Sequence, residues 1–409
     1  MKLRQKSSHV QRTATMMLAA GVVLAACAGN PAGSPSENGP IKVGMAISNT
    51  GTYAKLGPLY TDGAEYYLDM VNEQGGCPVG DIKRKFQLSV HDDQSDPQTG
   101  ARLIDRFITQ DQTNLILGGY GTASVQAASA VAEKNKAIYL NMGAVSASLY
   151  DRGFKYFFGS VPRAQDYLNG MVDLALMQDP KPQTVAFIFS NSEFTQELSE
   201  KTRVYAEEKG MEVVFFESYP EGATNVSALI SKIKASSPDV VFGGTHEADA
   251  ILIARQAQTA GLSPKLFGLS VGPTTPSFIK TLGDASEGVV GATPWSAQEQ
   301  KTSELWGTTA EWAKGFREKY GYDADYHTAG AFTHFELLCQ AITKAGSATP
   351  DDIAKAFRTN EFQALSHEGA FGDDGWSEKS ASSVMQIQDG KLVLVWPGAP
   401  ASKFRYPRE

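Results

Sequence analysis

The sequence predicts an α/β fold with two lobes, each built of a mainly parallel sheet flanked by helices. Three observations lead to this prediction. The chain has 409 residues, which is too long for one compact core. Short apolar runs alternate with amphipathic helical stretches from residue 41 onward. The same alternation restarts after Arg163, and two successive runs of this kind are typical of two α/β lobes.

Each element of the two runs follows from its hydrophobic period and its flanking turn residues. In the first run we expect strands at residues 41–47, 86–92, 115–117 and 137–140, and helices at residues 63–73, 98–110 and from Thr122. In the second run we expect helices at residues 167–177, 195–209, 225–234 and 248–261, and strands at residues 185–189, 212–217, 240–242 and 265–269.

The character of the sequence changes after residue 295, where helices dominate. They are expected at residues 304–320, 327–345 and 350–359. The chain then ends in a β-hairpin, residues 383–388 and 392–396, because Asp389-Gly390 between two apolar runs favours a tight turn. A helical block of this size makes a poor third domain, so we expect it to pack on the first lobe.

Residues 114–148 contain the strongest candidate for a binding site. They read as strand, turn, helix, strand and turn, and both turns are rich in glycine and hydroxyl side chains. Because the carboxyl ends of parallel strands meet at one edge of a sheet, backbone N–H groups and Ser/Thr oxygens from both turns could converge on an anion there. The alternative is two ordinary connections filled with small residues.

The N-terminus predicts export and anchoring. Four basic residues, Lys2, Arg4, Lys6 and Arg12, precede an apolar run at 16–26 that is too short to span a membrane. The run ends in Leu-Ala-Ala followed by Cys27, which resembles the bacterial lipoprotein lipobox. This resemblance implies a signal peptide at 1–26 and lipidation of the Cys27 thiol with fatty acids such as palmitate. A plain signal peptide is the alternative. Residues 27–40 are expected to form a flexible tether.

Composition and charge limit the classes of partner. The formal net charge is −8, which argues against a nucleic-acid partner. No stretch after the leader is long or apolar enough to cross a bilayer, so we expect an exported, monomeric protein that is soluble apart from its anchor. The remaining cysteines, Cys77 and Cys339, could pair, but the apolar helical setting of Cys339 favours a buried free thiol.

No motif indicates catalysis, a cofactor or a metal. His91, His246, His327 and His334 lack metal-ligand spacing, and residues 91–97 lack the glycine and distal glutamate of an EF-hand. There is no GxSxG elbow, and the turn Gly-Gly-Tyr-Gly-Thr at 118–122 fits neither a dinucleotide fingerprint nor a Walker loop.

Several segments together resemble the leucine/isoleucine/valine-binding protein family. They are GMAISNTGTYAKLG at 44–57, HDDQSDP at 91–97, the turns around Thr122 and Ser146, YGYDADYHTAGAFTHFELLCQAI at 320–342 and MQIQDGKLVLVWP at 385–397. The resemblance implies a type I periplasmic binding protein, which serves the permease subunits of an ABC transporter and has a three-segment hinge. Crossings near 160, 294 and 369 would assign residues 41–160 and 295–368 to an N-terminal lobe, and residues 161–294 and 369–409 to a C-terminal lobe.

The resemblance also assigns roles to individual residues. The hydroxyls of Thr122 and Ser146 match groups that hold a ligand carboxylate, and Ala144 matches a backbone contact. Phe194 lies where the family commonly has a tyrosine, and Leu56 lies at an often aromatic position. Tyr53, Tyr120, Trp295 and Tyr326 lie in loops or strand ends that a closed cleft could reach, and a packing role is the alternative for each. Gly121, in the turn before Thr122, is also a candidate for ligand contact.

One departure from the family concerns the ligand's charge. Residues 267–275, FGLSVGPTT, carry no acid where amino-acid binders place one against the α-ammonium group. Glu247 or Asp249 could substitute, or the solute could be a carboxylate, an amide or an aromatic acid without an ammonium group. The expected function is a lipid-anchored solute receptor of an ABC importer. A ligand sensor of the same fold, or an exported enzyme, is the alternative.

Overall fold

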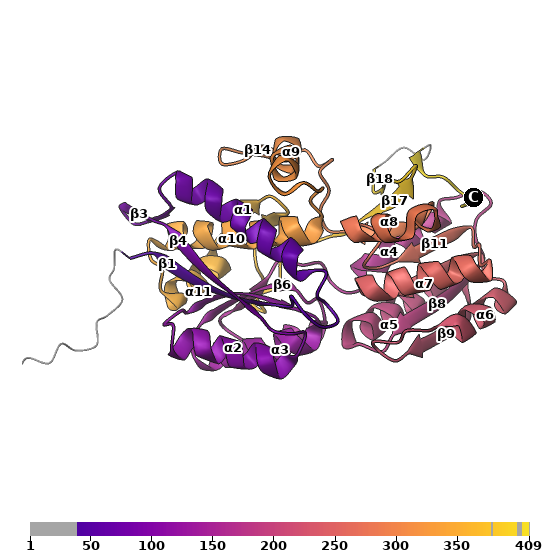
Figure 1. Ribbon diagram of the computed structural model, residues 1–409, viewed down its shortest axis with the longest axis horizontal. Coiled ribbons are helices and arrows are strands. Elements are labelled where there is room, and N and C mark those ends of the chain that lie inside the picture. Colours follow the sequence, from indigo (N-terminus) through magenta and orange to yellow (C-terminus); the bar gives the residue numbers. More distant parts are fainter. Residues whose placement is uncertain (1–38, 378, 399–402, 409) are drawn as a thin grey trace, which may run out of the picture. The chain divides into compact units, whose positions relative to one another are not determined.

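The computed structural model describes residues 39–377, 379–398 and 403–408. In these residues the chain forms a five-stranded and a seven-stranded sheet, each flanked by helices (Figure 1). The predicted α/β class with mainly parallel sheets is therefore confirmed. The predicted signal peptide, Cys27 and most of the tether lie outside the described residues.

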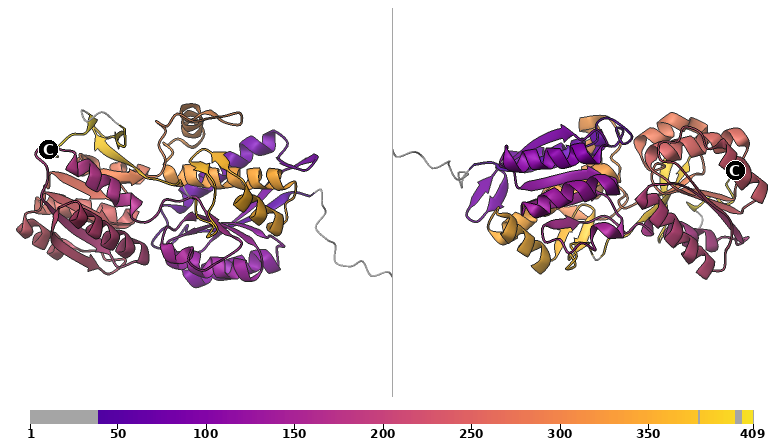
Figure 2. Two further views of the ribbon diagram at one scale, coloured as in Figure 1. Left: turned by 180° about the vertical axis from the view of Figure 1, so that it is seen from behind. Right: turned by 90° about the horizontal axis from the view of Figure 1, so that it is seen from below.

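The first sheet is parallel throughout and has the order β4-β1-β5-β6-β7. Alternate side chains of its strands face opposite layers of helices. Met45 and Leu117 pack toward α1 and α10, whereas Ala46 and Ile116 pack toward α2 and α3. Figure 2 shows α2 and α3 side by side on one face. The bounds are β1 (Ile41–Ile47), α1 (Gly57–Glu73), β4 (Phe86–Asp92), α2 (Pro97–Thr109), β5 (Leu115–Tyr120), α3 (Thr122–Lys134), β6 (Ile138–Gly143), a 3-10 turn (Ala147–Leu149) and β7 (Phe157–Gly159).

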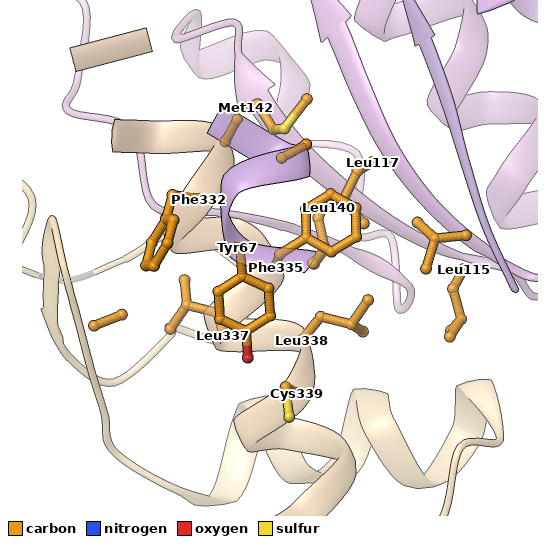
Figure 3. Packing of buried hydrophobic residues seen from close by; sticks show 14 of the residues in the cluster. Tyr67, Leu115, Leu117, Leu140, Met142, Phe332, Phe335, Leu337, Leu338 and Cys339 are labelled. Atoms are coloured by element: carbon orange, nitrogen blue, oxygen red, sulfur yellow. The ribbon is translucent and has the colours of Figure 1, made fainter. Parts of the chain in front are cut away.

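Two helices from the C-terminal part of the chain, α10 (Tyr326–Ala345) and α11 (Pro350–Thr359), pack on this first sheet. In Figure 3 the side chains of Phe332, Phe335 and Leu338 from α10 lie among Leu117 and Leu140 from β5 and β6. Most of α10 is buried, so the expectation that this helical block joins the first lobe agrees with the packing.

The second sheet has the order β18-β17-β12-β11-β10-β8-β9, in which only β17 and β18 pair antiparallel with their neighbours. Val185 and Phe187 face α4 and α5, and Ala186 and Ile188 face α6, α7 and α8. The bounds are α4 (Asp166–Leu176), β8 (Thr184–Ser190), α5 (Glu193–Glu208), β9 (Glu212–Tyr219), α6 (Ser227–Ser236), β10 (Val240–Gly244), α7 (Glu247–Ala260), β11 (Leu266–Leu269), α8 (Pro276–Leu282), a 3-10 turn (Gly283–Ser286), β12 (Val290–Thr293), β17 (Ser383–Gln388) and β18 (Lys391–Trp396).

Three segments connect the two sheets: β7 to β8, β12 to α10, and α11 to β17. On the third segment, Phe371 packs in the core of the first sheet and Trp376 pairs with Gly159 beside β7. Residues 371 and 376 thus contact the first sheet in this structure. The division of the chain into lobes, with a crossing near residue 369, stays a prediction.

Small hairpins lie on the connections between the main helices and strands and were not expected from the sequence. Their strands are β2 (Cys77–Val79) with β3 (Ile82–Arg84), β13 (Thr302–Ser303) with β14 (Gly307–Thr308), and β15 (Phe362–Ala364) with β16 (His367–Gly369). The helix expected at 304–320 accordingly begins later, as α9 (Thr309–Tyr320), because Thr308 and Glu311 form a capping box at its start.

The expectation of a free thiol at Cys339 is wrong, because Cys77 and Cys339 form a disulfide with their Cα atoms 5.6 Å apart. The β2–β3 hairpin packs against α10 and places Cys77 beside it. The two cysteines are 262 positions apart in the sequence, so only the tertiary packing of α10 reveals the pair.

Within the described ranges, no helix combines the length and the apolar character that a membrane span requires.

Candidate functional site

A cavity of about 370 Å³ lies between the carboxyl ends of strands from both sheets. Both sheets share one arrangement, in which the first strand of each run lies between the second and the third. In such sheets the crevice at the carboxyl ends of the strands is the usual ligand site. Residues 40–409 form one compact unit, and this cavity lies within that unit.

The first-sheet wall of the cavity consists of Gly121, Thr122 and Ala144, which follow β5 and β6. The hydroxyls of Thr122 and Ser146 are 2.8 Å apart, and both residues are buried. Ser146 is not on the wall itself but lies behind Thr122. Gly121 has a φ of +81°, and a Cβ there would lie 3.2 Å from the ring of Tyr53, so glycine is required in this turn.

Gly121 is also the N-cap residue of α3 and has no side chain to bind the first N–H groups of the helix. These donors therefore remain available next to the Thr122 hydroxyl. A helix N-terminus with a hydroxyl pair beside it suits an anion, because the N–H groups and the helix dipole both favour negative charge.

The backbone of Ala144 is held by the buried side chain of Asn141. The Asn141 amide donates to the carbonyl oxygen of Ala144 at 2.6 Å, and its oxygen accepts from the N–H of Ala144 at 3.0 Å. Asn141 thus fixes the turn after β6. The carbonyl oxygen of Ala144 keeps one lone pair for a ligand.

Three residues that the sequence predicted to contact the ligand differ in how close they lie to the cavity. The ring of Tyr120 lies on the cavity wall, whereas Tyr53 packs 4.9 Å behind it, centroid to centroid. The hydroxyl of Tyr53 donates to Glu221 of the second sheet's connections at 2.7 Å, and burial, followed by this hydrogen bond, raises the pKa of Tyr53. Leu56 is 2% exposed in the core of the first sheet and does not line the cavity.

The second-sheet wall consists of Phe194, His246 and Val271, which follow β8, β10 and β11. Nδ1 of His246 is 3.2 Å from the hydroxyl of Tyr120, and its Nε2 is 3.3 Å from the hydroxyl of Ser192. Burial, and then the neighbouring imidazole of His327, lower the pKa of His246 to about 4. This wall is therefore uncharged near neutral pH.

The two acids considered as partners for an ammonium group lie outside the cavity lining. Glu247 accepts a hydrogen bond from the hydroxyl of Thr275 at 3.0 Å, and Asp249 accepts one from the N–H of His246 at 3.2 Å. Burial raises the pKa of both carboxyls. Both residues sit in the first turn of α7, and the second carboxylate oxygen of Glu247 is buried without a hydrogen-bond partner among the described residues.

The structure adds wall residues that the sequence did not single out for this role. Tyr60 and Tyr167 project from α1 and α4, and four histidines line the cavity: His246, His327, His334 and His367. In the part of the chain that the structure describes, no group of three or more His, Cys, Asp or Glu residues is arranged to hold a metal. In the sequence, the triplet Asp325-Tyr326-His327 at the start of α10 could have pointed to these residues, but its role depends on the side-chain geometry.

Comparisons with known proteins agree with this arrangement. A sequence model of the family described as "Periplasmic binding protein" matches residues 40–391. "Leu/Ile/Val-binding protein homolog 8" of Brucella melitensis biotype 1 is 28% identical to the chain over 90% of its length and 93% of the relative.

Solved structures show the same fold. The branched-chain amino acid transporter substrate binding protein of Streptococcus pneumoniae, in complex with isoleucine, superposes with a TM-score of 0.75 at 19% identity, covering 86% of this chain and 97% of that one. A solute binding protein of an ABC transporter from Rhodopseudomonas palustris BisB5, in complex with 3,4-dihydroxy benzoic acid, gives a TM-score of 0.75 at 19% identity, with coverage of 86% and 95%.

Proposed function

The chain belongs to the periplasmic binding protein family, and we propose that it is the solute-binding component of an ABC importer that holds a small carboxylate between its two sheets. The observation that carries this proposal is the cavity whose first-sheet wall joins the Thr122–Ser146 hydroxyl pair to the uncapped start of α3. The hydroxyl of Thr122, held by Ser146 behind it, and the backbone at Gly121 and Ala144 would bind the carboxylate.

We further propose that the preferred solute lacks an ammonium group. Within the described part of the chain, the acids on the cavity wall are Glu299 and Glu368. Glu299 pairs with Lys301 at 3.2 Å, and Glu368 is exposed. Both lie on the connections between sheets, whereas the position after β11 is held by Val271, which is 2% exposed. Burying an ammonium group there without a counter-charge would be costly.

Aromatic side chains on the wall favour a flat, apolar solute body. Tyr60, Tyr120, Tyr167, Phe194 and Tyr326 come from elements of both sheet layers and their flanking helices, and rings of this kind pack well against another ring. An aromatic carboxylate therefore suits the cavity better than a short aliphatic amino acid.

Polar contacts between the two sheets would hold the closed form that a permease recognises. Besides the Tyr53–Glu221 bond, the N–H of Ala147 donates to Glu197 at 3.2 Å, and Ser148 donates to Glu193. These bonds join first-sheet loops to acids on α5 and after β9, which flank the second sheet. Solute binding in the cavity would add its own contacts to both sides and favour closure.

The proposal also includes a lipid anchor at the membrane. Lipidation at Cys27 would keep the protein at the outer side of the membrane, and the tether at 27–40 would let it reach the permease.

A thermal-shift screen followed by calorimetry tests the proposal. Benzoates, phenylpropionates and aliphatic carboxylates should raise the melting temperature, and mass spectrometry should recover the bound solute unchanged. A solute that is chemically converted would contradict the non-enzymatic role, and stabilisation by amino acids alone would contradict the solute class.

A further inference from the structure

His327, at the start of α10, lies on the cavity wall in an unusual polar environment. Its side chain and that of Asp325 are each 1% exposed, and Nδ1 of His327 is 2.7 Å from Oδ2 of Asp325. The other oxygen of Asp325 accepts hydrogen bonds from the backbone N–H groups of His327 and Thr328, both at 3.0 Å. Asp325 is thus the N-cap of α10 and the partner of the imidazole at once.

This pairing fixes the position of the imidazole proton. A carboxylate that receives donors on both oxygens acts only as an acceptor, so Nδ1 of His327 must carry a hydrogen. The ring is also held in place, because it stacks on Tyr326 at 3.9 Å and meets the ring of Tyr60 edge-on at 5.4 Å. In the neutral imidazole, Nε2 then presents a lone pair in a fixed direction.

Nε2 of His327 is buried and has no hydrogen-bond partner among the described residues. The other cavity-lining histidines differ in this respect. His246 has partners at both nitrogens, as given above. His334 lies 2.7 Å from the carbonyl oxygen of Gly330 and 3.3 Å from the hydroxyl of Ser160, and His367 contacts Ser377 and the carbonyl oxygen of Gly369. A buried polar atom left unpaired is costly, so this lone pair requires a partner from the cavity.

We infer that His327 is a specificity-determining residue that accepts a hydrogen bond at Nε2 from an O–H or N–H group on the solute, with Asp325 as the positioning residue that sets this direction. The inference rests on the proposed function, because it takes the solute to be a carboxylate in this cavity. The solute class it names is an aromatic carboxylate whose ring carries a hydroxyl or amino group.

The experiment compares four benzoates that differ only in the group at ring position 4. Amino donates a hydrogen bond, hydroxyl both donates and accepts, methoxy only accepts, and methyl does neither. We expect the wild-type protein to bind the amino and hydroxyl compounds about tenfold more tightly than the methoxy and methyl compounds, by calorimetry.

Asp325→Asn reverses the direction of the hydrogen bond without removing the helix cap. The asparagine oxygen can still accept from the N–H groups at the start of α10, while its amide would donate to Nδ1 of His327 and move the proton to Nε2. This variant should favour methoxy over amino. His327→Phe keeps the ring stack and should abolish all discrimination among the four compounds, and an unchanged melting temperature would show that both variants are folded.

Histidine ¹⁵N NMR of the solute-free protein provides a second readout that does not depend on binding. The wild type should carry its proton on Nδ1 of His327, and Asp325→Asn should carry it on Nε2. A wild-type proton on Nε2, or a wild-type order of preference retained in Asp325→Asn, would overturn the inference. Failure of all four benzoates to bind would instead contradict the proposed solute class, while the NMR spectrum still decides the role of Asp325.

Discussion

The two walls of the cavity are built from equivalent positions of similar sheets, yet their chemistry differs. The first-sheet wall offers hydroxyls and uncapped backbone N–H groups at Thr122 and Gly121. The second-sheet wall offers the rings of Phe194 and His246 and the side chain of Val271. Hydroxyls and N–H groups that suit an anion, opposite an uncharged and largely apolar wall, fit the proposed solute with one charged end. The difference between the walls therefore indicates the solute more directly than the fold does.

Adding an acid to the second-sheet wall should have the largest effect on the affinity for the solute. In Val271→Glu, a carboxylate would be buried opposite the anionic solute, so the affinity for benzoates measured by calorimetry at pH 8 should fall about 100-fold, or about 3 kcal/mol. Val271→Met is the uncharged control and should lose far less. An undiminished affinity in Val271→Glu would mean that this position does not face the solute.

Removing a hydroxyl from the first-sheet wall should have the next largest effect. Thr122→Val keeps the shape of the side chain but leaves Ser146 without its partner, and we expect carboxylate affinity to fall by about 1–3 kcal/mol. Thr202→Val is a matched control, because the buried hydroxyl of Thr202 has no hydrogen-bond partner among the described residues. Equal affinities for the two variants would refute the carboxylate site at Thr122.

The neutral state of His246 in the second-sheet wall should change how the stability of the protein depends on pH in acid. The pKa of His246 is lowered by burial from 6.5 to about 4, so the unfolded chain takes up a proton that the folded chain excludes. The stability contributed by this group is complete above pH 6.5 and is lost as the pH falls toward 4. Urea unfolding should show the wild type losing about 2 kcal/mol more than His246→Gln between pH 7.5 and pH 4.5. Parallel pH profiles would show that His246 is not held neutral.

A smaller effect should come from the ring of Phe194, whose centroid is 5.4 Å from that of His246. Phe194→Leu retains an apolar wall but removes a stacking surface, so affinity for aromatic carboxylates should fall by about 1 kcal/mol. Affinity for aliphatic carboxylates should change little. If calorimetry gave the same loss for both classes, Phe194 would serve packing of the wall and not ring recognition.

The sequence predicted the elements whose signals are local. The Asp389-Gly390 turn predicted the β17–β18 hairpin, and glycine with hydroxyl residues at 118–122 predicted the turn from β5 into α3. Features that depend on distant contacts were not predictable. Cys77 meets Cys339 only because α10 packs beside the β2–β3 hairpin.

The same limit applies to the site. Small residues after β5 and β6 predicted an edge that could bind an anion, and the missing acid at 267–275 left open whether the solute carries an ammonium group. The free Nε2 of His327 could not be predicted, because it depends on how Asp325 and the neighbouring rings orient one imidazole.

The contrast between the walls is tested most directly by solute pairs that differ only in an α-ammonium group. Calorimetry would compare 3-phenylpropionate with phenylalanine and 4-methylpentanoate with leucine on the wild-type protein. We expect the compound without the ammonium group to bind at least about tenfold more tightly in each pair, because no buried acid on the second-sheet wall offsets the cost of desolvating that charge. Tighter binding of phenylalanine and leucine would contradict the account.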